Sequence, residues 1–420
     1  LAEGVKRGQI MARIAVVGSG ISGLTAAYKL SKLHEVHLLE KNFKLGGHTD
    51  THRFEIDGTV LKVDSGFIVH NDKTYPEFQK ILTELGCKTS PTEMSFSVKR
   101  SDLEYKGKNL NTLFAQRSNL ASISFFKMVR DILKFNNRAS QKIEIDSERT
   151  IGDYLEEENY SSEFKNNYLL PMAGAIWSTG KAPIKAFPLE AFLNFFQNHG
   201  LLQLRNRPNW MVVDGGSESY VNAMSEKIGK VFLNCEVIGI KRGKAKVTLK
   251  SKNFVADYDR VIIATHSDQG LRLLEDPTEL ELDILGAMKY TPNKVVIHTD
   301  EKLMPKRKLA WASWNYNLDA NENQASMTYY MNLLQSLPVK DSIFVTLNEP
   351  EQIEQDKILA RREYEHPFYD QGMLESQKRH SEISGKNRTY FAGAYWGNGF
   401  HEDGVKSGLQ AFREIEAIEC

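Results

Sequence analysis

Short apolar runs alternate with glycine-rich turns along this chain, and their order predicts its fold. The run 14–17 predicts a buried strand, the helical spacing of 24–30 predicts a helix, and the run 36–39 predicts a second strand. This order is typical of a βαβ unit with parallel strands. Other segments with strand character lie at 54–60, with an Asp-Gly turn, and at 63–69, 212–213, 231–240, 245–250, 261–265, 294–299, 342–347 and 389–393.

Helical spacing recurs further along the chain. The segment 74–85 is followed by Gly86, a common helix stop, and another helix is expected from about 405 to 417. The segment 120–135 carries apolar residues at helical spacing, with Lys127, Arg130 and Lys134 between them. Two interpretations of 120–135 stay open: a helix packed in a helical subdomain, or a basic amphipathic helix that lies on a membrane surface or gates a lipid entrance.

Composition narrows the classes of function. The 420 residues are 41% hydrophobic and 26% charged, which is ordinary for a soluble globular protein. Lys+Arg and Asp+Glu both number 54, so the chain lacks the basic surplus typical of nucleic-acid-binding proteins. Three widely separated cysteines form no C-x-x-C motif, which predicts neither a disulfide framework nor a metal site and fits a reducing cytoplasm.

No apolar run approaches the ~20 residues that span a bilayer. Residues 1–10 are polar and lack the apolar core of a signal peptide. Because Met11 directly precedes the first predicted strand, we expect residues 1–10 to be an extension outside the fold.

The turn after the first predicted strand has the pattern G-x-G-x-x-G. Gly18 permits a tight turn, Gly20 lets the backbone approach a pyrophosphate, and Gly23 lets the helix pack against the strand. The helix N-terminus offers free N–H groups to phosphates. Glu40 ends the second strand, where an acid accepts hydrogen bonds from a ribose. A glycine-rich turn in an ordinary βαβ unit is the alternative, but the strand, helix and acid together favour a dinucleotide site.

Further motifs make the chain recognisable. It resembles the flavin amine oxidase, protoporphyrinogen oxidase and phytoene desaturase superfamily from about Arg13 to its C-terminus. Within it, the chain is most similar to bacterial FAD-dependent oxidoreductases encoded beside cyclopropane-fatty-acid synthase-like methyltransferases. The motifs that carry the resemblance are LGGHT at 45–49, VDSGFIV at 63–69, PMAGAIWS at 171–178, WASWNY at 311–316 and FAGAYWGNGFHEDG at 391–404.

The resemblance implies an α/β fold in which a Rossmann-like FAD-binding domain is interleaved with a mixed α+β substrate domain. We expect the FAD-binding domain to comprise 11–75, 206–290 and 385–420, and the substrate domain to comprise 76–205, a helical insertion, and 291–384. FAD is expected to be bound non-covalently, because no cysteine lies where some amine oxidases attach it. No metal is expected.

The resemblance also assigns cofactor-binding roles. His48 departs from the superfamily pattern, which usually has Arg at this position and uses it to contact phosphate. Asp403, Gly404 and Val405 would direct backbone N–H groups and a helix N-terminus toward the flavin, where they would stabilise the charge formed on reduction. The residues expected to hold FAD are Gly18, Ser19, Gly20, Ile21, Ser22, Gly23, Glu40, Lys41, Gly46, Gly47, His48, Gly66, Phe67, Val237, Ala264, Gly393, Glu402, Asp403, Gly404 and Val405.

The resemblance also implies catalytic roles for four side chains, and each of them has a purely structural alternative. Lys294 matches a lysine that amine oxidases bridge by water to the flavin, or it is a surface lysine on a strand. Phe400 and Trp396 match the region of an aromatic cage, or they are packing residues. His401 is a proton relay near the flavin, or a histidine fixed by its neighbours.

Three hypotheses for function follow. The first is an FAD-dependent desaturase or oxidase that removes hydride from an apolar, fatty-acyl lipid substrate, with the flavin reoxidised by oxygen or another acceptor. The second is a flavin amine oxidase. The third is a lipid- or prenyl-binding carrier on the same fold without redox turnover. The expected partners are an apolar or membrane-lipid substrate, a methyltransferase of the same pathway and a peripheral membrane contact, with no nucleic acid. The expected location is the cytoplasm, with contact at the inner membrane surface.

Overall fold

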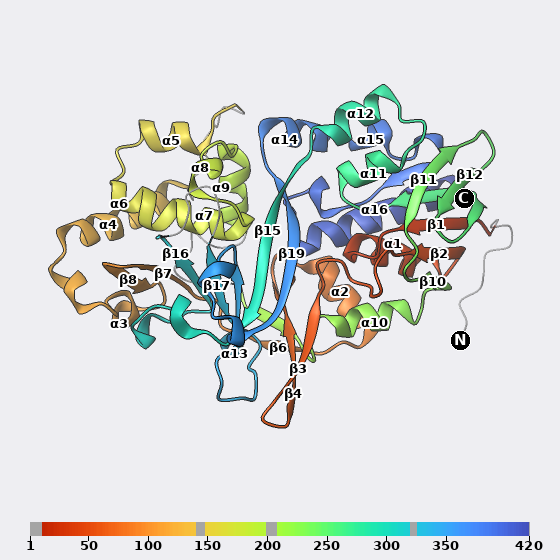
Figure 1. The fold of residues 1–420 in the computed structure, drawn as a ribbon. Helices are drawn as coiled ribbons and strands as arrows, with labels where there is room; N and C mark the ends of the chain where they lie inside the picture. Colours follow the sequence, from red (N-terminus) through yellow and green to blue (C-terminus); the bar gives the residue numbers. More distant parts are fainter. Residues whose placement is uncertain (1–10, 140–147, 199–207, 320–325, 420) are drawn as a thin grey trace.

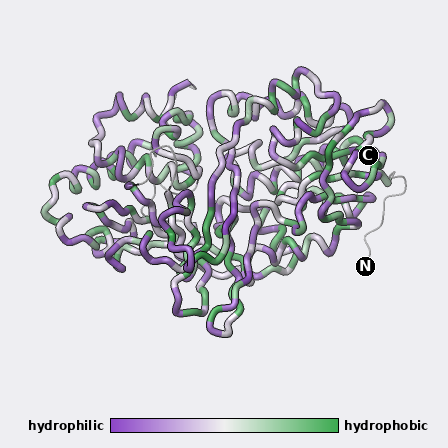
Figure 2. The backbone as a smooth tube through the Cα atoms, viewed as in Figure 1, coloured by the Kyte–Doolittle hydropathy of each residue, from purple (hydrophilic) through white to green (hydrophobic). Residues whose placement is uncertain are grey.

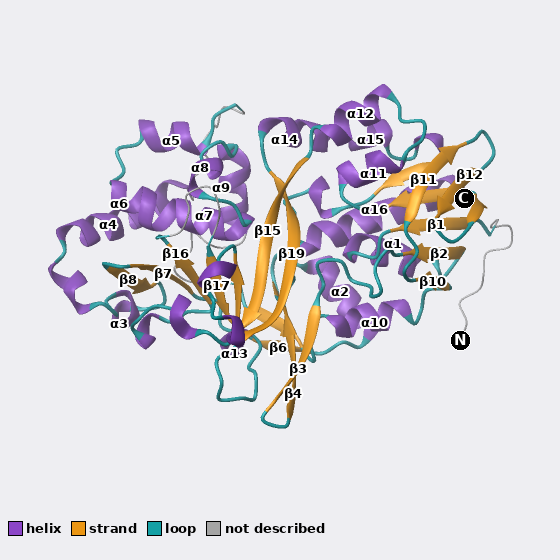
Figure 3. Ribbon diagram, viewed as in Figure 1, coloured by secondary structure: helices purple, strands orange, loops and turns teal. Residues whose placement is uncertain are grey.

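The computed structural model describes residues 11–139, 148–198, 208–319 and 326–419, so the predicted extension 1–10 lies outside the described residues. The chain forms two main sheets with helices around them (Figures 1 and 3). Hydrophobic stretches gather in the interior of the molecule, whereas hydrophilic stretches follow much of the outer helices and loops (Figure 2). None of the helices in the described part is long and apolar enough to cross a membrane.

The first sheet is parallel and contains the predicted βαβ unit. Its strand order is β10-β2-β1-β14-β20. Both faces of β1 are covered, which explains its unbroken apolar run. The strands are β1 (Arg13–Val17), β2 (Glu35–Leu39), β10 (Lys230–Phe232), β14 (Arg260–Ile263) and β20 (Thr389–Phe391).

Helices α1 (Ile21–Leu30) and α16 (His401–Glu419) pack beside this sheet and against each other. Two glycines of α16 permit the close approach. A Cβ at Gly404 would lie 2.5 Å from Ile21, and one at Gly408 would lie 2.4 Å from the carbonyl oxygen of Ser22. The other helices near this sheet are α2 (Pro76–Leu85), α10 (Glu218–Ser225), α11 (Ser267–Leu273), α12 (Glu279–Gly286), α14 (Gln371–Lys378) and α15 (His380–Ile383).

The second sheet is mixed and has the order β19-β15-β18-β17-β16-β7-β8. Its two long strands, β15 (Lys289–His298) and β19 (Ile358–Phe368), form a ribbon that stands between the two halves of the molecule (Figure 1). The other strands are β7 (Phe96–Arg100), β8 (Leu103–Lys106), β16 (Trp314–Asn317), β17 (Met327–Tyr330) and β18 (Phe344–Leu347).

A helical block lies beyond the β15–β19 ribbon from the parallel sheet, next to strands β16, β7 and β8 (Figure 1). Its largest shared feature is an aromatic core around Phe135, Phe164 and Phe192. The helices are α4 (Ile123–Ala139), α5 (Ile151–Glu157), α6 (Ser162–Phe164), α7 (Leu170–Trp177), α8 (Lys181–Ile184) and α9 (Leu189–Asn198). The short helix α3 (Leu110–Leu113) lies beside β8, and α13 (Met331–Leu334) follows β17.

Small sheets complete the fold. The predicted Asp-Gly turn joins β3 (Thr51–Ile56) to β4 (Thr59–Asp64), and both turn residues have positive φ, as this hairpin turn requires. A second small sheet contains β5 (Val69–Asn71), β6 (Thr89–Pro91) and β9 (Trp210–Val213), and a third contains β11 (Val237–Arg242), β12 (Val247–Ser251) and β13 (Val255–Tyr258).

The prediction of one strand over 231–240 was wrong. Asn234 has a φ of 50°, which breaks the extended backbone between β10 and β11, and the two strands belong to different sheets. The alternating order of the strands fits interleaved domains, while the domain boundaries stay predictions.

Candidate functional site

The glycine turn after β1 has the predicted tight geometry. Gly18 has a φ of 100°, and its N–H donates to the carbonyl oxygen of Leu39 at 2.9 Å, which ties β1 to β2. A Cβ at Gly23 would lie 2.0 Å from the carbonyl oxygen of Gly18. Because no side chain fits there, α1 can begin directly against the end of the strand.

The start of α1 is open to a ligand. Gly20 is the N-cap and no side chain caps the helix, whose first turn contains no acidic residue. A Cβ at Gly20 would meet nothing within 4 Å, so free space lies in front of the uncapped N–H groups. This arrangement fits the diphosphate of a dinucleotide, which helix N-termini bind through N–H groups and the helix dipole.

Glu40 is held rigidly at the end of β2. Its Oε2 accepts hydrogen bonds from the N–H of Ser19 at 3.1 Å and from Ser19 Oγ at 2.6 Å, and its Oε1 accepts from the N–H of Asn42 at 2.9 Å. The side chain is buried but lines the cavity described below. At this position the carboxylate can accept hydrogen bonds from the hydroxyl groups of a ribose.

The second glycine motif runs directly against the first. A Cβ at Gly47 would lie 3.2 Å from the Cα of Gly20, and one at Gly66 would lie 2.0 Å from the carbonyl oxygen of His48. Three backbone segments around Gly20, Gly47 and Gly66 therefore approach one another at this end of the cavity. Such close approach explains why this part of the sequence is so rich in glycine.

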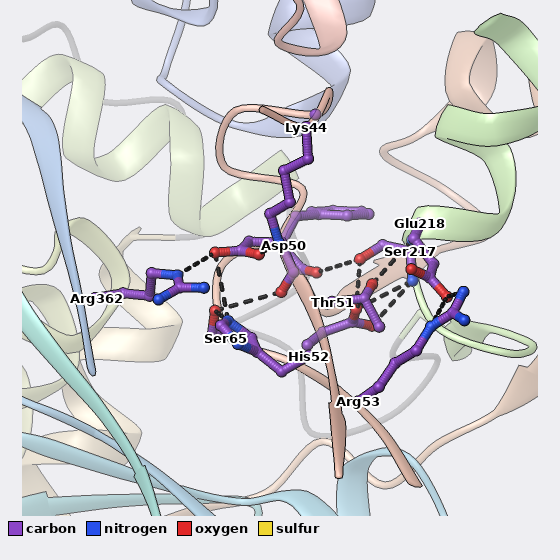
Figure 4. Close-up of polar contacts among 12 residues, drawn as sticks. Lys44, Asp50, Thr51, His52, Arg53, Ser65, Ser217, Glu218 and Arg362 are labelled. Carbon is purple, nitrogen blue, oxygen red and sulfur yellow. Dashed lines mark hydrogen bonds and ion pairs between the residues drawn. The ribbon is translucent and has the colours of Figure 1, made fainter. Parts of the chain in front are cut away.

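Asp50 fastens the second glycine motif to the long ribbon (Figure 4). Its carboxylate forms an ion pair with Lys44, and it accepts hydrogen bonds at 2.9 Å from Arg362 Nε and from the hydroxyl of Tyr364. Although burial favours the neutral acid, the bonds from His52 and Lys44 hold the pKa of Asp50 below its ordinary value. Asp50 therefore stays ionised and ties the loop to β19.

One cavity of about 1620 Å³ joins the two halves of the molecule. We call the end around Gly18, Glu40 and Gly47 the cofactor half. We call the opposite end the aromatic half, lined by Met94, Phe96, Tyr105, Tyr168, Met172, Ile176, Trp177, Phe195, Trp314, Tyr329, Tyr369 and Phe400. Its long shape fits a dinucleotide at one end and a separate, mainly apolar substrate at the other.

The cavity brings together most of the predicted cofactor-binding residues. Those that line it are Gly18, Ser19, Gly20, Ile21, Ser22, Glu40, Lys41, Gly46, Gly47, His48, Gly66, Phe67, Val237, Ala264 and Gly393. Gly23 acts behind the lining, through the packing of α1 on β1.

The predicted segment 402–405 does not line the cavity. The carboxylate of Glu402 instead accepts hydrogen bonds from the N–H groups of Glu77 and Phe78, at 3.1 and 3.0 Å, and so caps α2. Asp403 accepts from the N–H of Phe400 at 3.0 Å, which closes the first turn of α16. Gly404 packs against Ile21 of α1, and the buried Val405 joins the apolar core between α1, α16 and the parallel sheet. These contacts hold the start of α16 in place behind the cavity wall.

Two of the catalytic candidates lie away from the cavity. The side chain of Lys294 is 64% exposed, and its nearest carboxylate partner is Glu351 at 3.8 Å. Trp396 packs against the ring of His380, at 4.5 Å between ring centroids, behind the lining. Their positions therefore agree with the structural alternatives: Lys294 is a surface lysine on a strand, and Trp396 is a packing residue.

Phe400 and His401 both reach the cavity. Phe400 stacks on Phe195 of the aromatic half, with ring centroids 4.7 Å apart. His401 stacks on Phe67 at 3.6 Å, and its Nε2 is 2.6 Å from the hydroxyl of Tyr220. Burial keeps the pKa of His401 well below its ordinary value. His401 is therefore a neutral histidine fixed by its neighbours, which is the alternative to a freely titrating relay.

Sequence reasoning missed two histidines between the cofactor and aromatic halves. His266 and His366 line the cavity beside His48, with ring centroids 5.9 and 5.4 Å from that of His48. Burial lowers the pKa of His48 and of His266 to about 4, and that of His366 to about 3. All three are neutral at pH 7, so His48 does not replace the charge of the arginine that is usual at its position.

A usable signal existed for one of the missed histidines. His266 follows the end of β14 by three residues, and the carboxyl end of a parallel strand is a common place for ligand-binding residues. His366 gave no local signal, because β19 brings it to the site from a distant part of the chain.

The parallel sheet, the glycine turn with its uncapped helix and the acid at the end of β2 define a dinucleotide-binding protein with a separate apolar chamber. Residues 21–338 match the family described as flavin containing amine oxidoreductase. The chain belongs to this family and is an FAD-dependent oxidoreductase with a fold of the amine oxidase type.

Individual proteins similar to this chain differ in what they act on. An L-amino-acid oxidase of Trimeresurus stejnegeri is 23% identical over 98% of this chain and 88% of its own length. The flavin-dependent L-tryptophan oxidase of Lentzea aerocolonigenes is 47% identical over 13% of this chain and 12% of its own. Among solved structures, a putrescine oxidase variant has a TM-score of 0.71 at 18% identity, covering 97% of this chain and 99% of that one.

A fatty acid isomerase from P. acnes has a TM-score of 0.70 at 14% identity, covering 96% of this chain and 98% of that one. At these identities the solved structures show the shared fold alone.

Proposed function

We propose that this protein removes hydride from an apolar acyl chain, a fatty-acyl group of a lipid, and passes it to FAD. FAD supplies the redox chemistry when bound, and the chain's own residues bind and orient the substrate. The observation that carries the proposal is the chemistry of the aromatic half, whose walls are mainly aromatic and aliphatic side chains. Such walls favour an apolar substrate because its burial removes apolar surface from water.

One carboxylate at the aromatic half, that of Glu93, is already paired and is not free to bind an amine. Glu93 forms an ion pair with Lys106 at 2.8 Å and a second one with Lys108, and it accepts a hydrogen bond from Ser95. Although burial opposes ionisation, these partners lower the pKa of Glu93 to about 2. A cationic substrate would have to displace two lysines, whereas an apolar chain would leave these pairs intact.

Exposed apolar side chains on α3 and α4 support contact with a lipid bilayer. Lys108, just before α3, lines the cavity and has an exposed side chain. Leu110 and Ile123, close by in the chain, are each 76% exposed, and Leu133 is 51% exposed. On α4, Phe125, Met128 and Phe135 face the core, while an outer stripe places Ile123, Phe126, Lys127, Arg130 and Leu133 toward solvent.

This outer stripe combines apolar and cationic side chains, which suits the surface of an anionic membrane. Thus α4 packs in the helical block, as one interpretation of 120–135 expected, and its outer face keeps the membrane contact as a proposal. A methyltransferase that modifies the same acyl chains stays the expected pathway partner.

Amine oxidation is the second candidate. It is favoured by the L-amino-acid oxidases that match 96–98% of this chain and 86–88% of their own length. The paired state of Glu93 disfavours it. The carrier hypothesis is dropped, because the family is one of oxidoreductases.

An anaerobic flavin spectrum tests the proposal. The yellow holoprotein is mixed in turn with a phospholipid that carries acyl chains, with putrescine and L-amino acids, and with NADPH. Bleaching of the flavin by the phospholipid alone is the expected result. Bleaching by an amine alone would replace the proposal with amine oxidation, and reduction by NADPH alone would remove the acyl substrate as the electron donor.

Vesicle flotation tests the membrane contact separately. The Ile123→Asp and Leu133→Asp variants should lose binding to vesicles that contain phosphatidylserine. Val60→Asp is the matched control, because Val60 is 65% exposed on the β3–β4 hairpin and lies outside the α4 stripe. Equal binding by all variants would overturn the assignment of this surface.

A further inference from the structure

His366 lies at the point where the cofactor half meets the aromatic half. Its ring centroid is 5.4 Å from that of His48, whose carbonyl oxygen faces Gly66. On the other side, the next residues of β19 lead to Tyr369 of the aromatic half, and Pro367 packs beside Gly399. The reactive part of a bound flavin must face the substrate, so it must reach this junction.

A chain of amides fixes the proton of His366. The N–H of Lys294 donates to Asn348 Oδ1 at 2.9 Å, so the Nδ2 of Asn348 is the group that points at Asn293. That Nδ2 donates to Asn293 Oδ1 at 2.8 Å. Asn293 Nδ2 in turn is 3.2 Å from the carbonyl oxygen of Thr291 and 3.0 Å from His366 Nδ1.

Each orientation in this chain is determined by a backbone group. A backbone N–H can only donate and a carbonyl can only accept, so Lys294 fixes the amide of Asn348 and Thr291 fixes that of Asn293. Asn293 therefore donates to His366, and Nδ1 of His366 must accept. Because the imidazole, which is partly buried in the cavity wall, is neutral, its single proton is on Nε2.

The chain of amide side chains belongs to the β15–β19 ribbon and its neighbouring strand, and its central residue is shielded from solvent. Asn293 is 1% exposed, and Lys294 pairs with Glu363 across the two strands. Asn348 has a φ of 62°, a conformation that asparagine tolerates better than most residues, and its own N–H donates to the carbonyl oxygen of Lys294 at 2.8 Å. The backbone thus holds both ends of the amide chain.

The Nε2 of His366 has no hydrogen-bond partner among the described residues, while the side chain lines the cavity. The three histidines of this wall do not form a metal site in the described part of the chain. What the wall offers is a neutral N–H group held in one tautomer. A neutral N–H group can donate a hydrogen bond to an acceptor that gains electrons, and so stabilise the negative charge that develops there.

We propose that His366 is a hydrogen-bond donor to the flavin ring system, and that Asn293 and Asn348 are positioning residues that keep its proton on Nε2. The donor stabilises the negative charge that accumulates on the flavin when it is reduced, so it raises the reduction potential. This inference concerns the cofactor and does not depend on the identity of the substrate.

The reduction potential of the bound flavin tests the proposal without any substrate, by equilibration with a reference dye. His366→Leu removes the donor and should shift the reduction equilibrium roughly tenfold toward the oxidised form, as loss of a hydrogen bond to a charged group would. For a two-electron couple this corresponds to about 30 mV. His366→Gln keeps an amide donor and should restore part of the shift.

Asn293→Asp tests the tautomer. An aspartate accepts from Nδ1–H, so it should move the proton to Nδ1 and lower the potential although His366 is still present. Lys294→Gln is the matched control: it changes the net charge by the same −1, one residue away, on the exposed face of β15.

Unchanged potentials in the flavin-loaded His366→Leu and Asn293→Asp proteins would overturn the proposal, as would an equal shift in Lys294→Gln. Should His366→Leu fail to fold, Asn293→Asp and His366→Gln decide the question. Failure of an acyl lipid to bleach the flavin would leave these potentials unaffected, so the two proposals fail separately.

Discussion

The cofactor half and the aromatic half of the cavity are built in opposite ways. The cofactor half consists largely of backbone: glycine turns, an uncapped helix start and one fixed carboxylate close together in the sequence. The aromatic half consists of side chains from the helical block, the second sheet and the C-terminal segment, none of which is complete without the others. A site made of backbone tolerates few substitutions, whereas a site made of side chains can change its substrate by changing their shapes.

The largest expected effect comes from filling the turn of the cofactor half. Gly23→Ala would place a Cβ 2.0 Å from the carbonyl oxygen of Gly18. Such overpacking against backbone costs about 3 kcal/mol or more. We expect little soluble protein and no bound flavin, measured by the ratio of flavin absorbance to protein absorbance.

Gly20→Ala is its matched partner. A Cβ there meets no protein atom within 4 Å, and the φ of −62° suits alanine. The apoprotein should keep its melting temperature, while FAD affinity falls roughly tenfold as the methyl group intrudes on the diphosphate space. Normal FAD affinity in Gly20→Ala would contradict the assignment of this space to the cofactor.

The junction between the halves should make stability depend on pH. The folded pKa values of His48 and His266, about 4, lie below the ordinary value of 6.5, because burial disfavours the charged form. The unfolded chain therefore binds protons between pH 6.5 and 4 that the folded chain does not. Stability is complete above pH 6.5 and falls as the pH drops toward 4.

Each such histidine contributes a slope of up to about 1.36 kcal/mol per pH unit. Urea midpoints measured at saturating FAD should fall over this interval, and His266→Gln should flatten the curve by one such contribution. A His266→Gln curve parallel to that of the wild type would show that His266 titrates alike in both states.

A smaller effect should separate the aromatic half from the residues behind it. Phe400→Ala removes the ring stacked on Phe195. Aromatic pairs contribute about 0.5–1.5 kcal/mol, so flavin reduction by an acyl substrate should slow by up to roughly tenfold at unchanged FAD content.

Trp396→Phe changes an aromatic residue four positions away that does not line the cavity. It should leave the rate of flavin reduction as it is. Equal losses in both variants, measured by stopped-flow absorbance, would mean that the boundary drawn for the aromatic half is wrong.

The same contrast explains what the sequence could predict. The part of the cofactor half from Gly18 to Gly47 is formed by neighbours within about thirty residues, a distance over which glycine spacing and strand periodicity are informative. The fold class of the protein, its cofactor and most of the residues that line the cofactor half could be predicted from that pattern and from the family resemblance. The aromatic half and His366 depend on long-range contacts, which no local pattern encodes.

Lys294 illustrates a second limit. The resemblance implied a functional side chain on β15. β15 does contribute one, because the buried Asn293 hydrogen bonds to His366 in the cavity wall. Successive side chains of a strand point to opposite faces, so a shift of one residue exchanges inside and outside. Asn293 is inside and Lys294 is outside. Alignment to a family can find the strand without finding the face.

The β15–β19 ribbon also limits how the enzyme can open. At one end its strands continue into α12 and α14 beside the parallel sheet, and at the other end β15 pairs with β18 of the second sheet. Ten residue pairs along its length make the ribbon rigid. The contacts of Asp50 and His366 depend on this rigid ribbon. A clam-like opening would have to bend it and break those contacts. Traffic of substrate and product is therefore expected to pass through a fixed opening in the wall, so access would be set by the width of a doorway and not by the swing of a hinge.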